Sequence, residues 1–307
     1  MATDVRPAAA GFDPIATLTF GSYRLAAMAA RAMPGPATRA LAPTFGFGAH
    51  LASGDRRDMI ARHLVRVDPT LGGIRLRRAV QGAFDSYARY WLESFRLPYL
   101  SVSAVDRGMR ADGFGHITEG LALGNGVILA LPHLGGWEWA GRWLVDRGHG
   151  VTVVVERLEP PELFDWFADL RARLGMNVVA LGPDAGREVI SALRRNDIVC
   201  LLCDRDIQRN GVDVEFFGER TTLPAGPVTV ALRTKAPILP TAVYFTDHNN
   251  GHLGVVRPPV SLERTDSLRA DVARGTQLLA SELEYLVRRA PHQWHMFQPN
   301  WPSDPGY

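Results

Sequence analysis

The chain has 307 residues, of which 46% are hydrophobic, and a formal net charge of +2 at pH 7. This length and apolar share are sufficient for one enzyme-sized hydrophobic core, and we expect no nucleic-acid partner. The only cysteines are Cys200 and Cys203, which excludes a small disulfide-stapled domain and favours a reducing, cytosolic setting.

Two segments near the N-terminus have the periodicity of amphipathic helices. Apolar residues from Ile15 to Ala32 recur along one face, and an aromatic-rich stripe with arginines beside it extends from Leu76 to Phe95. Such helices either lie in a lipid interface, with arginines at anionic headgroups, or pack on the rest of the protein. Because this half of the chain is basic, we expect residues 1–112 to form a helical, membrane-facing segment of the same domain.

The sequence contains no candidate transmembrane helix. Arg24 and Arg31 interrupt the long apolar N-terminal stretch, and no run approaches the roughly 20 apolar residues of a bilayer span. Asp4, Pro7 and Asp13 stand where a signal peptide has its basic and apolar regions. We therefore expect a peripheral protein at the cytoplasmic face of the plasma membrane.

Strand-like and helix-like stretches alternate from about residue 127 to 260, as is typical of βαβ units. The predicted fold is a single α/β domain in which residues 113–307 form a catalytic core around a mixed, largely parallel sheet flanked by helices. Prolines in the last strand-like stretch favour an edge or interrupted strand there. The strand-like stretches are Val127–Leu131, Val151–Val155, Ile198–Cys203 and Pro237–Tyr244.

A histidine follows the first of these strands. His133 precedes the pair Gly135 and Gly136, and Glu138 comes five residues after the histidine. A neutral imidazole held by a carboxylate can act as a general base, whereas the alternative is a histidine that merely precedes a helix with an acid in its first turn. Five residues on one helix would turn Glu138 about 140° away from His133, so the helix is expected to begin only at Gly136 or Trp137.

Charged residues also collect after the next two strands. Glu156 follows the second strand, and Asp204, Arg205 and Asp206 follow the third. Each acid alone is typical of a surface residue that ends a strand. Because open α/β sheets place their chemistry beyond the carboxyl ends of the strands, these acids together could supply the partner that His133 needs.

Several other kinds of site are excluded or disfavoured. The sequence has no G-x-S-x-G elbow, no G-x-x-x-x-G-K-[ST] loop and no complete G-x-G-x-x-G. His292 and His295 have no further ligand-like Cys or His nearby, and Cys200 and Cys203 lie on a strand where residues three apart point to opposite faces, so neither pair predicts a metal. Without an activated nucleophile, direct transfer between two bound substrates is the simpler mechanism, and no cofactor is expected.

Several segments together carry a family resemblance. They are similar to the bacterial lysophospholipid and lipid A type acyltransferases, and most of all to the phosphatidylinositol mannoside branch, in order over roughly residues 10 to 302. The segments that carry the resemblance are 133–138, 204–206, 211–218, 231–237 and 293–301.

The resemblance implies transfer of a palmitoyl-type chain from palmitoyl-CoA to a mannose hydroxyl of phosphatidylinositol mannosides at an anionic membrane surface. His133 corresponds to the family's histidine and Glu138 to its acid, with a second carboxylate placed at Glu156 or Asp206. Which carboxylate touches His133 stays open. The alternatives are another glycolipid or lysophospholipid acceptor, or a noncatalytic lipid-binding protein.

The chemistry of such a transfer suggests residues for substrate binding. The backbone N–H groups of Gly135 and Gly136 are the candidates for holding the oxyanion of the tetrahedral intermediate. Arg171, on a helix predicted over 160–174, is a candidate contact for the CoA phosphates or else a surface charge partner. Arg205 would orient the two acids that flank it, Asp204 and Asp206, or meet the substrate, and Asp204 is a further candidate for substrate binding. Phe217 would help to line the acyl slot together with Phe216 and the aromatic helix at 84–95.

Overall fold

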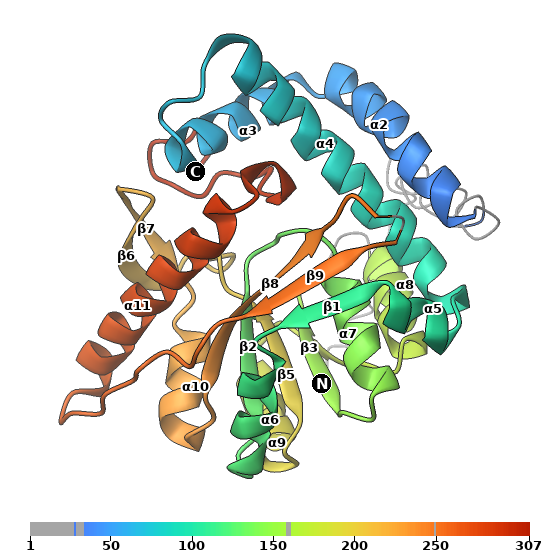
Figure 1. The fold of residues 1–307 in the computed structure, drawn as a ribbon. Coiled ribbons are helices and arrows are strands. Elements are labelled where there is room, and N and C mark those ends of the chain that lie inside the picture. The colour runs from blue at the N-terminus through green and yellow to red at the C-terminus, as the bar shows by residue number, and fades with distance from the viewer. Residues whose placement is uncertain (1–27, 29–33, 158–160, 249) are drawn as a thin grey trace, which may run out of the picture.

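The architecture is that of a mixed seven-stranded sheet with helices on both faces, in a computed structural model that describes residue 28 and residues 34–157, 161–248 and 250–307. This confirms the predicted fold class (Figure 1). The amphipathic helix predicted at 15–32 lies outside the described residues, apart from Met28.

The strand order is β1-β9-β8-β2-β5-β3-β4. Neighbouring strands are parallel except β8 and β9, which are antiparallel. A separate two-stranded hairpin, β6–β7, extends from the domain. The strands are β1 Met109–Asp112, β2 Val127–Leu131, β3 Val151–Val155, β4 Asn177–Ala180, β5 Ile198–Leu202, β6 Val212–Phe216, β7 Glu219–Leu223, β8 Ile238–Phe245 and β9 His252–Val256.

The helices connect and cover these strands. The segment predicted to be a helix at 160–174 is confirmed as α8, and the aromatic stripe lies on α4. The α-helices are α2 Gly35–Ala52, α3 Gly54–Val67, α4 Gly73–Arg96, α5 Val102–Arg107, α6 Phe114–Ala122, α7 Trp137–Asp146, α8 Pro161–Arg173, α9 Ala185–Arg194, α10 Gly226–Thr234 and α11 Leu268–Arg288, with 3₁₀ turns at Leu97–Tyr99 and Pro291–Gln293. None of the described helices is long and apolar enough to cross a membrane.

Strand β2 shows why the sheet is buried on both faces. Ile128 and Ala130 point into a core formed with α9, α10 and α11, whereas Val127, Leu129 and Leu131 point into a second core formed with α5, α6 and α7. Because side chains alternate along a strand, burial on both faces requires the continuous apolar run that the sequence shows.

Strand β8 corrects the expectation of an edge or interrupted strand. It is fully buried and lies between β9 and β2. Its ladder with β9 begins only at Thr241, so Pro240, which has no N–H to donate, lies just beyond the last pair. Pro237 precedes the strand and accepts a hydrogen bond from Ile128 N–H through its carbonyl oxygen.

Helix α4 crosses the carboxyl edge of the sheet, with α2 packed on its outer side (Figure 1). The two helices approach closely because Gly46 has no side chain: a Cβ there would stand 2.7 Å from the Cα of Asp85. On the inner side, Leu92 and Phe95 of α4 join Phe167 of α8 in a small apolar cluster. The edge of the sheet that carries the predicted site is therefore covered by aromatic helix surface.

Candidate active site

A tight turn places His133 just beyond the carboxyl end of β2. Gly135 has φ +62°, in the left-handed region that favours glycine, and a Cβ at this position would collide with the carbonyl oxygen of Val243. Helix α7 then begins at Trp137, as predicted from the motif. His133 is thus separated from the helix and faces a large cavity at the strand ends, with 25% of its side chain exposed.

Asp204 is the carboxylate that the structure joins to His133. Its Oδ1 lies 2.6 Å from His133 Nδ1, and its Oδ2 accepts a hydrogen bond of 2.8 Å from the His133 backbone N–H. Asp204 is 0% exposed. Because an ionised carboxylate only accepts hydrogen bonds, Nδ1 carries the ring hydrogen and Nε2 presents a lone pair.

Further donors keep Asp204 ionised. Burial opposes the ionisation of Asp204. Two partners outweigh burial and lower the pKa of Asp204: His133, through its charge and hydrogen bonds, and Trp294, whose indole N–H lies 2.7 Å from Oδ2. Asn300 donates its side-chain amide to the backbone carbonyl of Asp204 at 2.9 Å. The backbone N–H of His295 donates to the His133 carbonyl at 2.7 Å.

Glu138 has other partners. Its Oε1 accepts hydrogen bonds from Arg171 Nη2 at 2.5 Å, from Arg171 Nε at 3.0 Å and from the Tyr90 hydroxyl at 3.1 Å. Glu138 and Tyr90 are buried, and Arg171 is nearly so. The buried ion pair therefore ties α7 to α8 and α4, and Arg171 is neither a surface charge partner nor a free cation.

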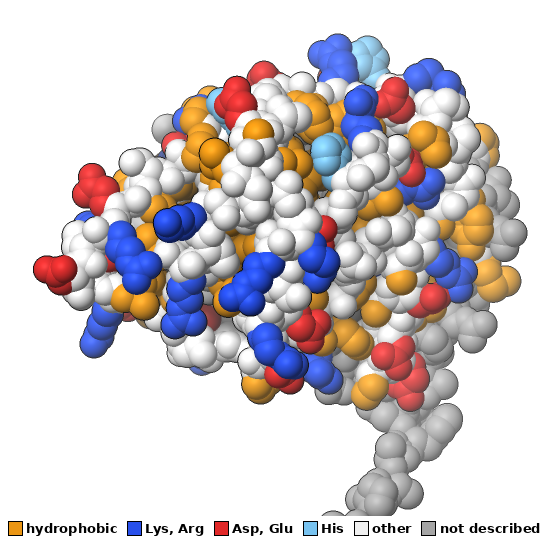
Figure 2. All heavy atoms as spheres, turned by 90° about the horizontal axis from the view of Figure 1, so that it is seen from below, with side chains coloured by type: hydrophobic (Ala, Val, Ile, Leu, Met, Phe, Trp, Pro, Cys, Tyr) orange, Lys and Arg blue, Asp and Glu red, His pale blue; other side chains and the backbone are white. Residues whose placement is uncertain are grey.

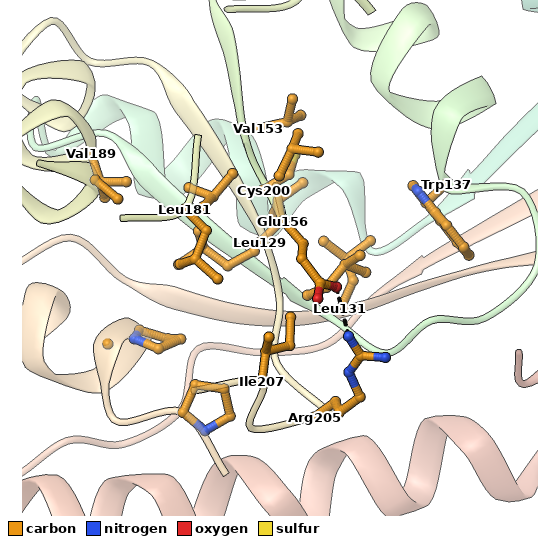
Figure 3. Close-up of a pocket in the computed structure, with 18 of the residues that line it drawn as sticks. Leu129, Leu131, Trp137, Val153, Glu156, Leu181, Val189, Cys200, Arg205 and Ile207 are labelled. Carbon is orange, nitrogen blue, oxygen red and sulfur yellow. Dashed lines mark hydrogen bonds and ion pairs between the residues drawn. The ribbon is translucent and has the colours of Figure 1, made fainter. Parts of the chain in front are cut away.

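The other two acids considered at the sequence level also lie apart from the His133–Asp204 pair. Glu156 accepts a hydrogen bond of 2.6 Å from Arg205, and both line the cavity (Figure 3). Asp206 accepts hydrogen bonds from Gly211 N–H at 2.7 Å and from the Thr222 hydroxyl at 2.8 Å. Asp206 therefore closes the loop that precedes the β6–β7 hairpin.

Three expectations about binding residues need correction. The N–H groups of Gly135 and Gly136 already donate to the carbonyl oxygens of Gln293 and Val243, at 2.9 and 3.0 Å, so they are not available to an oxyanion. Asp204 is sealed behind His133 and is not exposed to a substrate. Phe217 is buried against Trp residues of the C-terminal segment and is not among the residues that line the cavity, and its neighbour Phe216 is fully buried as well.

The segment 293–301 is part of the family resemblance, and its His295 is disfavoured as a metal ligand, but the sequence did not predict the role of this segment at the catalytic pair. This segment supplies Trp294 and Asn300 to Asp204, and its His295 lines the cavity. Burial lowers the pKa of His295 to about 3, so its ring is neutral and makes a hydrogen bond of 2.9 Å with Ser86. The only signal in the sequence is the density of Trp, His and Asn in one short stretch.

The cavity in front of His133 has a volume of about 1420 Å³. One branch extends between the sheet and α7, where its wall is almost entirely apolar, as Figure 3 shows for the side chains on neighbouring strands. Tyr87, Tyr90 and Trp91 of α4 also line the cavity. The apolar wall residues of this branch include Leu129, Leu131, Val153, Cys200, Leu202, Gly141 and Leu144.

The cavity contains no activated thiol among its described residues. Burial raises the pKa of the Cys200 thiol to about 12, so it is not a nucleophile near neutral pH. A buried Asp–His pair at the mouth of an apolar cavity can instead take a proton from a hydroxyl that is held beside a long hydrocarbon chain. This is the geometry of enzymes that transfer an acyl group to an alcohol through a general base.

Comparisons with known proteins agree with this class. The model of the bacterial lipid A biosynthesis acyltransferase family matches residues 16–303. The chain is 39% identical over 294 residues to a phosphatidylinositol mannoside acyltransferase of Mycobacterium tuberculosis (strain H37Rv), covering 94% of this chain and 90% of that protein. A protein of the same name from Mycolicibacterium smegmatis is 35% identical over 278 residues, covering 89% and 88%. The chain therefore belongs to the bacterial lipid A biosynthesis acyltransferase family, and it is an acyltransferase.

Proposed function

We propose that this acyltransferase moves a palmitoyl-type chain from acyl-CoA to a mannose hydroxyl of phosphatidylinositol mannosides. The observation that carries the general-base part of the proposal is the 2.6 Å contact between His133 Nδ1 and the buried Asp204, with the imidazole open to the cavity. The names of the relatives, at 35–39% identity, support the acceptor.

In the proposed reaction, Nε2 of His133 takes the proton of the mannose hydroxyl while its oxygen attacks the thioester carbonyl carbon. The tetrahedral intermediate then collapses, the carbon–sulfur bond breaks, and the CoA thiolate receives the proton from the imidazolium. Asp204 holds the ring and stabilises its positive charge. No covalent acyl-enzyme forms, and the products are the ester and free CoA.

The oxyanion needs donors other than Gly135 and Gly136. The first N–H groups of a helix have no acceptor within the helix, and α7 begins at Trp137, beside His133. We assign the N–H groups of Trp137 and Glu138 to this role, where the positive end of the helix dipole also favours negative charge.

The apolar branch beside α7 is the proposed site for the acyl chain, because its wall excludes water from a hydrocarbon. Arg205 and Glu156, paired at the cavity mouth, are proposed to meet the polar acceptor. In this proposal Arg171 fixes the position of Glu138. Its contact with CoA stays a prediction.

Incubation of the purified protein with palmitoyl-CoA and phosphatidylinositol mannosides tests the proposal. Fragmentation of the product by mass spectrometry should locate one new ester on a mannose. A lysophospholipid and a lipid A precursor, offered in parallel, should be acylated far more slowly. Preferential acylation of either would replace the proposed acceptor, and absence of any CoA-dependent transfer would overturn the reaction itself.

A membrane-facing role is proposed for the N-terminal helices. Phe45, Phe47 and Leu51 of α2 and Ile74 at the start of α4 are exposed, and arginines of α4 such as Arg75 are exposed beside them. Exposed apolar side chains with neighbouring cations suit an anionic bilayer surface. We place the protein on the cytoplasmic face of the plasma membrane, where its lipid acceptor would reach the cavity mouth below α4.

A further inference from the structure

The cavity has a second branch on the opposite face of the sheet from α7. Gly186, Ile190 and Arg194 line it from α9, at a spacing of four residues, and Gly226 and Arg233 line it from α10 at a spacing of seven. Gly226, Val230 and Arg233 lie on one face of α10. By contrast, α9 lines the space with all residues of its first two turns, 185–191, and then with Arg194 at its end. We refer to this space as the α9–α10 groove.

The groove leads away from the catalytic edge. Helix α9 connects β4 to β5, and α10 connects the β6–β7 hairpin to β8, so each helix leads back to the amino end of a strand of the sheet. Ten helical residues span about 15 Å at 1.5 Å per residue, which is the approximate length of the groove along α9. Helices α9 and α10 contact one another, and in Figure 1 both lie in the lower part of the molecule, away from α2 and α4.

The chemistry of the groove changes along its length. At its upper end a Cβ on Gly186 or on Gly226 would meet no atom within 4 Å, so the entrance is wide. The middle is lined by apolar side chains of both helices and of the sheet, among them Ile190 and Val230. The lower end carries Arg194 and Arg233, both exposed.

The cations at the lower end are available to a ligand. Neither Arg194 nor Arg233 is part of an ion pair within the described parts of the chain. On the rim, Arg187 is paired with Asp184, and Glu188 is the carboxylate that lines the groove. Seen from below, Lys and Arg side chains gather on this face of the molecule (Figure 2).

We propose that the α9–α10 groove binds the CoA half of the donor, with the neutral phosphopantetheine arm in its apolar middle and the phosphates of the 3′-phosphorylated ADP at Arg194 and Arg233. The inference rests on the proposed acyl-CoA reaction. With the acyl chain beside α7 and the thioester at His133, the rest of the donor must leave the catalytic edge by another route. The planar fork of arginine binds phosphate oxygens through two hydrogen bonds at once.

A phosphate of the lipid acceptor would offer the same chemistry, but its position disfavours it. The exposed apolar residues of α2 and the lower ends of α9 and α10 lie on opposite sides of the molecule (Figure 1). A lipid anchored in a bilayer at α2 would have to reach across the whole domain to place its phosphate at Arg194. The donor headgroup is water-soluble and has no such constraint.

Binding of CoA to the full-length protein, measured by titration calorimetry, tests the groove directly. The double variant Arg194→Ala/Arg233→Ala should raise the Kd for CoA at least about tenfold, because hydrogen bonds between charged groups are lost. The matched control is Arg195→Ala: Arg195 is the next residue, is exposed and pairs with Asp197, but does not line the groove. Its Kd should equal that of the wild type.

Steady-state kinetics separate the two phosphate sources. The double variant should raise the KM for palmitoyl-CoA by a similar factor, while the KM for the mannoside acceptor and the rate with S-palmitoyl pantetheine, which lacks the ADP part, should not change. Gly186→Trp fills the entrance without a backbone clash and should weaken CoA binding independently of charge. A raised acceptor KM with unchanged CoA affinity would assign the arginines to the acceptor and overturn the inference.

Failure of the inference differs from failure of the proposed function. If the wild-type protein binds CoA and transfers palmitate, but both groove variants bind CoA as tightly as the wild type, the CoA half lies elsewhere and only the groove assignment is wrong. If the wild-type protein neither binds CoA nor uses it as a donor, the proposed reaction is wrong, and the groove assignment fails with it.

Discussion

At the scale of single residues, the protons around His133 are fully accounted for. Asp204 accepts from the ring Nδ1–H, from the backbone N–H of His133 and from the indole of Trp294, so both of its oxygens are occupied by donors. Nothing in this arrangement gives Asp204 a proton to carry. Its role follows from electrostatics and orientation, and Nε2 is left as the proton acceptor.

Replacement of this carboxylate by its isosteric amide is the first prediction. Asp204→Asn removes the negative charge that stabilises the imidazolium and offers an N–H to Nδ1, which favours the wrong tautomer. We expect kcat to fall by about 10²-fold to 10⁴-fold. Glu156→Gln, which removes the carboxylate that follows β3 and lines the cavity, should cost clearly less. Circular dichroism checks that both variants are folded, and initial rates give their kcat values. A larger loss of kcat in Glu156→Gln than in Asp204→Asn would give the relay role to Glu156.

Trp294 offers a subtler test. Trp294→Phe deletes the N–H that lies 2.7 Å from Asp204 but keeps most of the buried ring. We expect kcat to fall about tenfold with KM nearly unchanged, since one hydrogen bond to a charged group is lost. Without this donor the pKa of Asp204 rises, and the more basic carboxylate stabilises the imidazolium of His133 more strongly. The acidic limb of the pH–rate profile should therefore move to higher pH.

The control for this variant is Trp301→Phe. Trp301 is as deeply buried, but its indole N–H donates to the carbonyl of Phe216 at 3.1 Å and not to the catalytic pair. It should lower stability without moving the pH profile. If both variants change the profile equally, Trp294 acts only through packing.

The pairing of His133 with Asp204 was predictable in principle from strand register. Leu131 of β2 pairs with Leu202 of β5, and each of the two site residues stands two positions further along its strand. The sequence does not reveal that β2 and β5 are neighbours, because β3 and β4 come between them in the chain but not in this part of the sheet. The choice among several strand-end acids therefore stayed open until the strand order was known.

At the scale of secondary-structure elements, the Glu138–Arg171 pair links α7 to α8. A buried carboxylate that loses its partner, or a buried guanidinium that loses its carboxylate, is an uncompensated charge. Glu138→Ala should therefore lower the free energy of unfolding by about 3–5 kcal/mol. Glu138→Gln/Arg171→Met, which removes both charges, should recover much of this loss.

Urea denaturation of the two variants checks this prediction. If Glu138→Ala abolishes turnover but unfolds at the wild-type urea concentration, the carboxylate acts in the reaction and not in holding the helices together. The five-residue spacing in the sequence could not distinguish these roles, because the partner Arg171 comes from a helix 33 residues further along.

A second buried carboxylate fixes the C-terminal segment to α3. Asp304 receives hydrogen bonds from His63 and from the N–H groups of Asn300 and Trp301, and these outweigh burial and hold its pKa well below the ordinary value. A depressed pKa in the folded state contributes stability above the unfolded value, near 3.9, that is lost as the pH falls. Asp304→Asn should thus lower the Tm at pH 7, and the difference from the wild type should shrink below about pH 4. A Tm difference that does not depend on pH would contradict this.

Local patterns predicted some elements better than others. The strand Val151–Val155 was predicted residue for residue, and β2 occupies the apolar run predicted as a strand before His133, because largely apolar runs of that length suit a strand buried on both faces. The position of β8 in the sheet was predicted wrongly, since the cost of a proline depends on which neighbour its nitrogen faces. The neighbour of a strand is set by the tertiary structure, and local sequence preferences do not reveal it.

At the scale of the whole molecule, the fold separates two surfaces that the proposed reaction needs. Tyr87, Tyr90 and Trp91 of α4 line the cavity on the side of the molecule where α2 packs, whereas α9 and α10, which carry Arg194 and Arg233, lie on the side away from α2 (Figure 1). A water-soluble donor and a membrane lipid can therefore approach His133 from different directions. Among the described N-terminal helices, α4 is the one that lines this site.

If the lipid acceptor approaches from the α2 side and the donor from the α9–α10 side, the exposed apolar side chains of α2 should bind the membrane. Phe45→Ser/Phe47→Ser/Leu51→Ser removes exposed apolar surface from α2 and should reduce co-sedimentation with vesicles that contain phosphatidylglycerol, because each buried aromatic or leucine contributes about 1.5–3 kcal/mol. Leu123→Ser is the matched control, since Leu123 is 64% exposed but lies at the end of α6, on the other side of the domain. The triple variant should keep its turnover on acceptor dispersed in detergent. Equal loss of vesicle binding in both variants would mean that the membrane binds no particular face of the protein. The proposal that the lipid approaches from the α2 side would then be wrong.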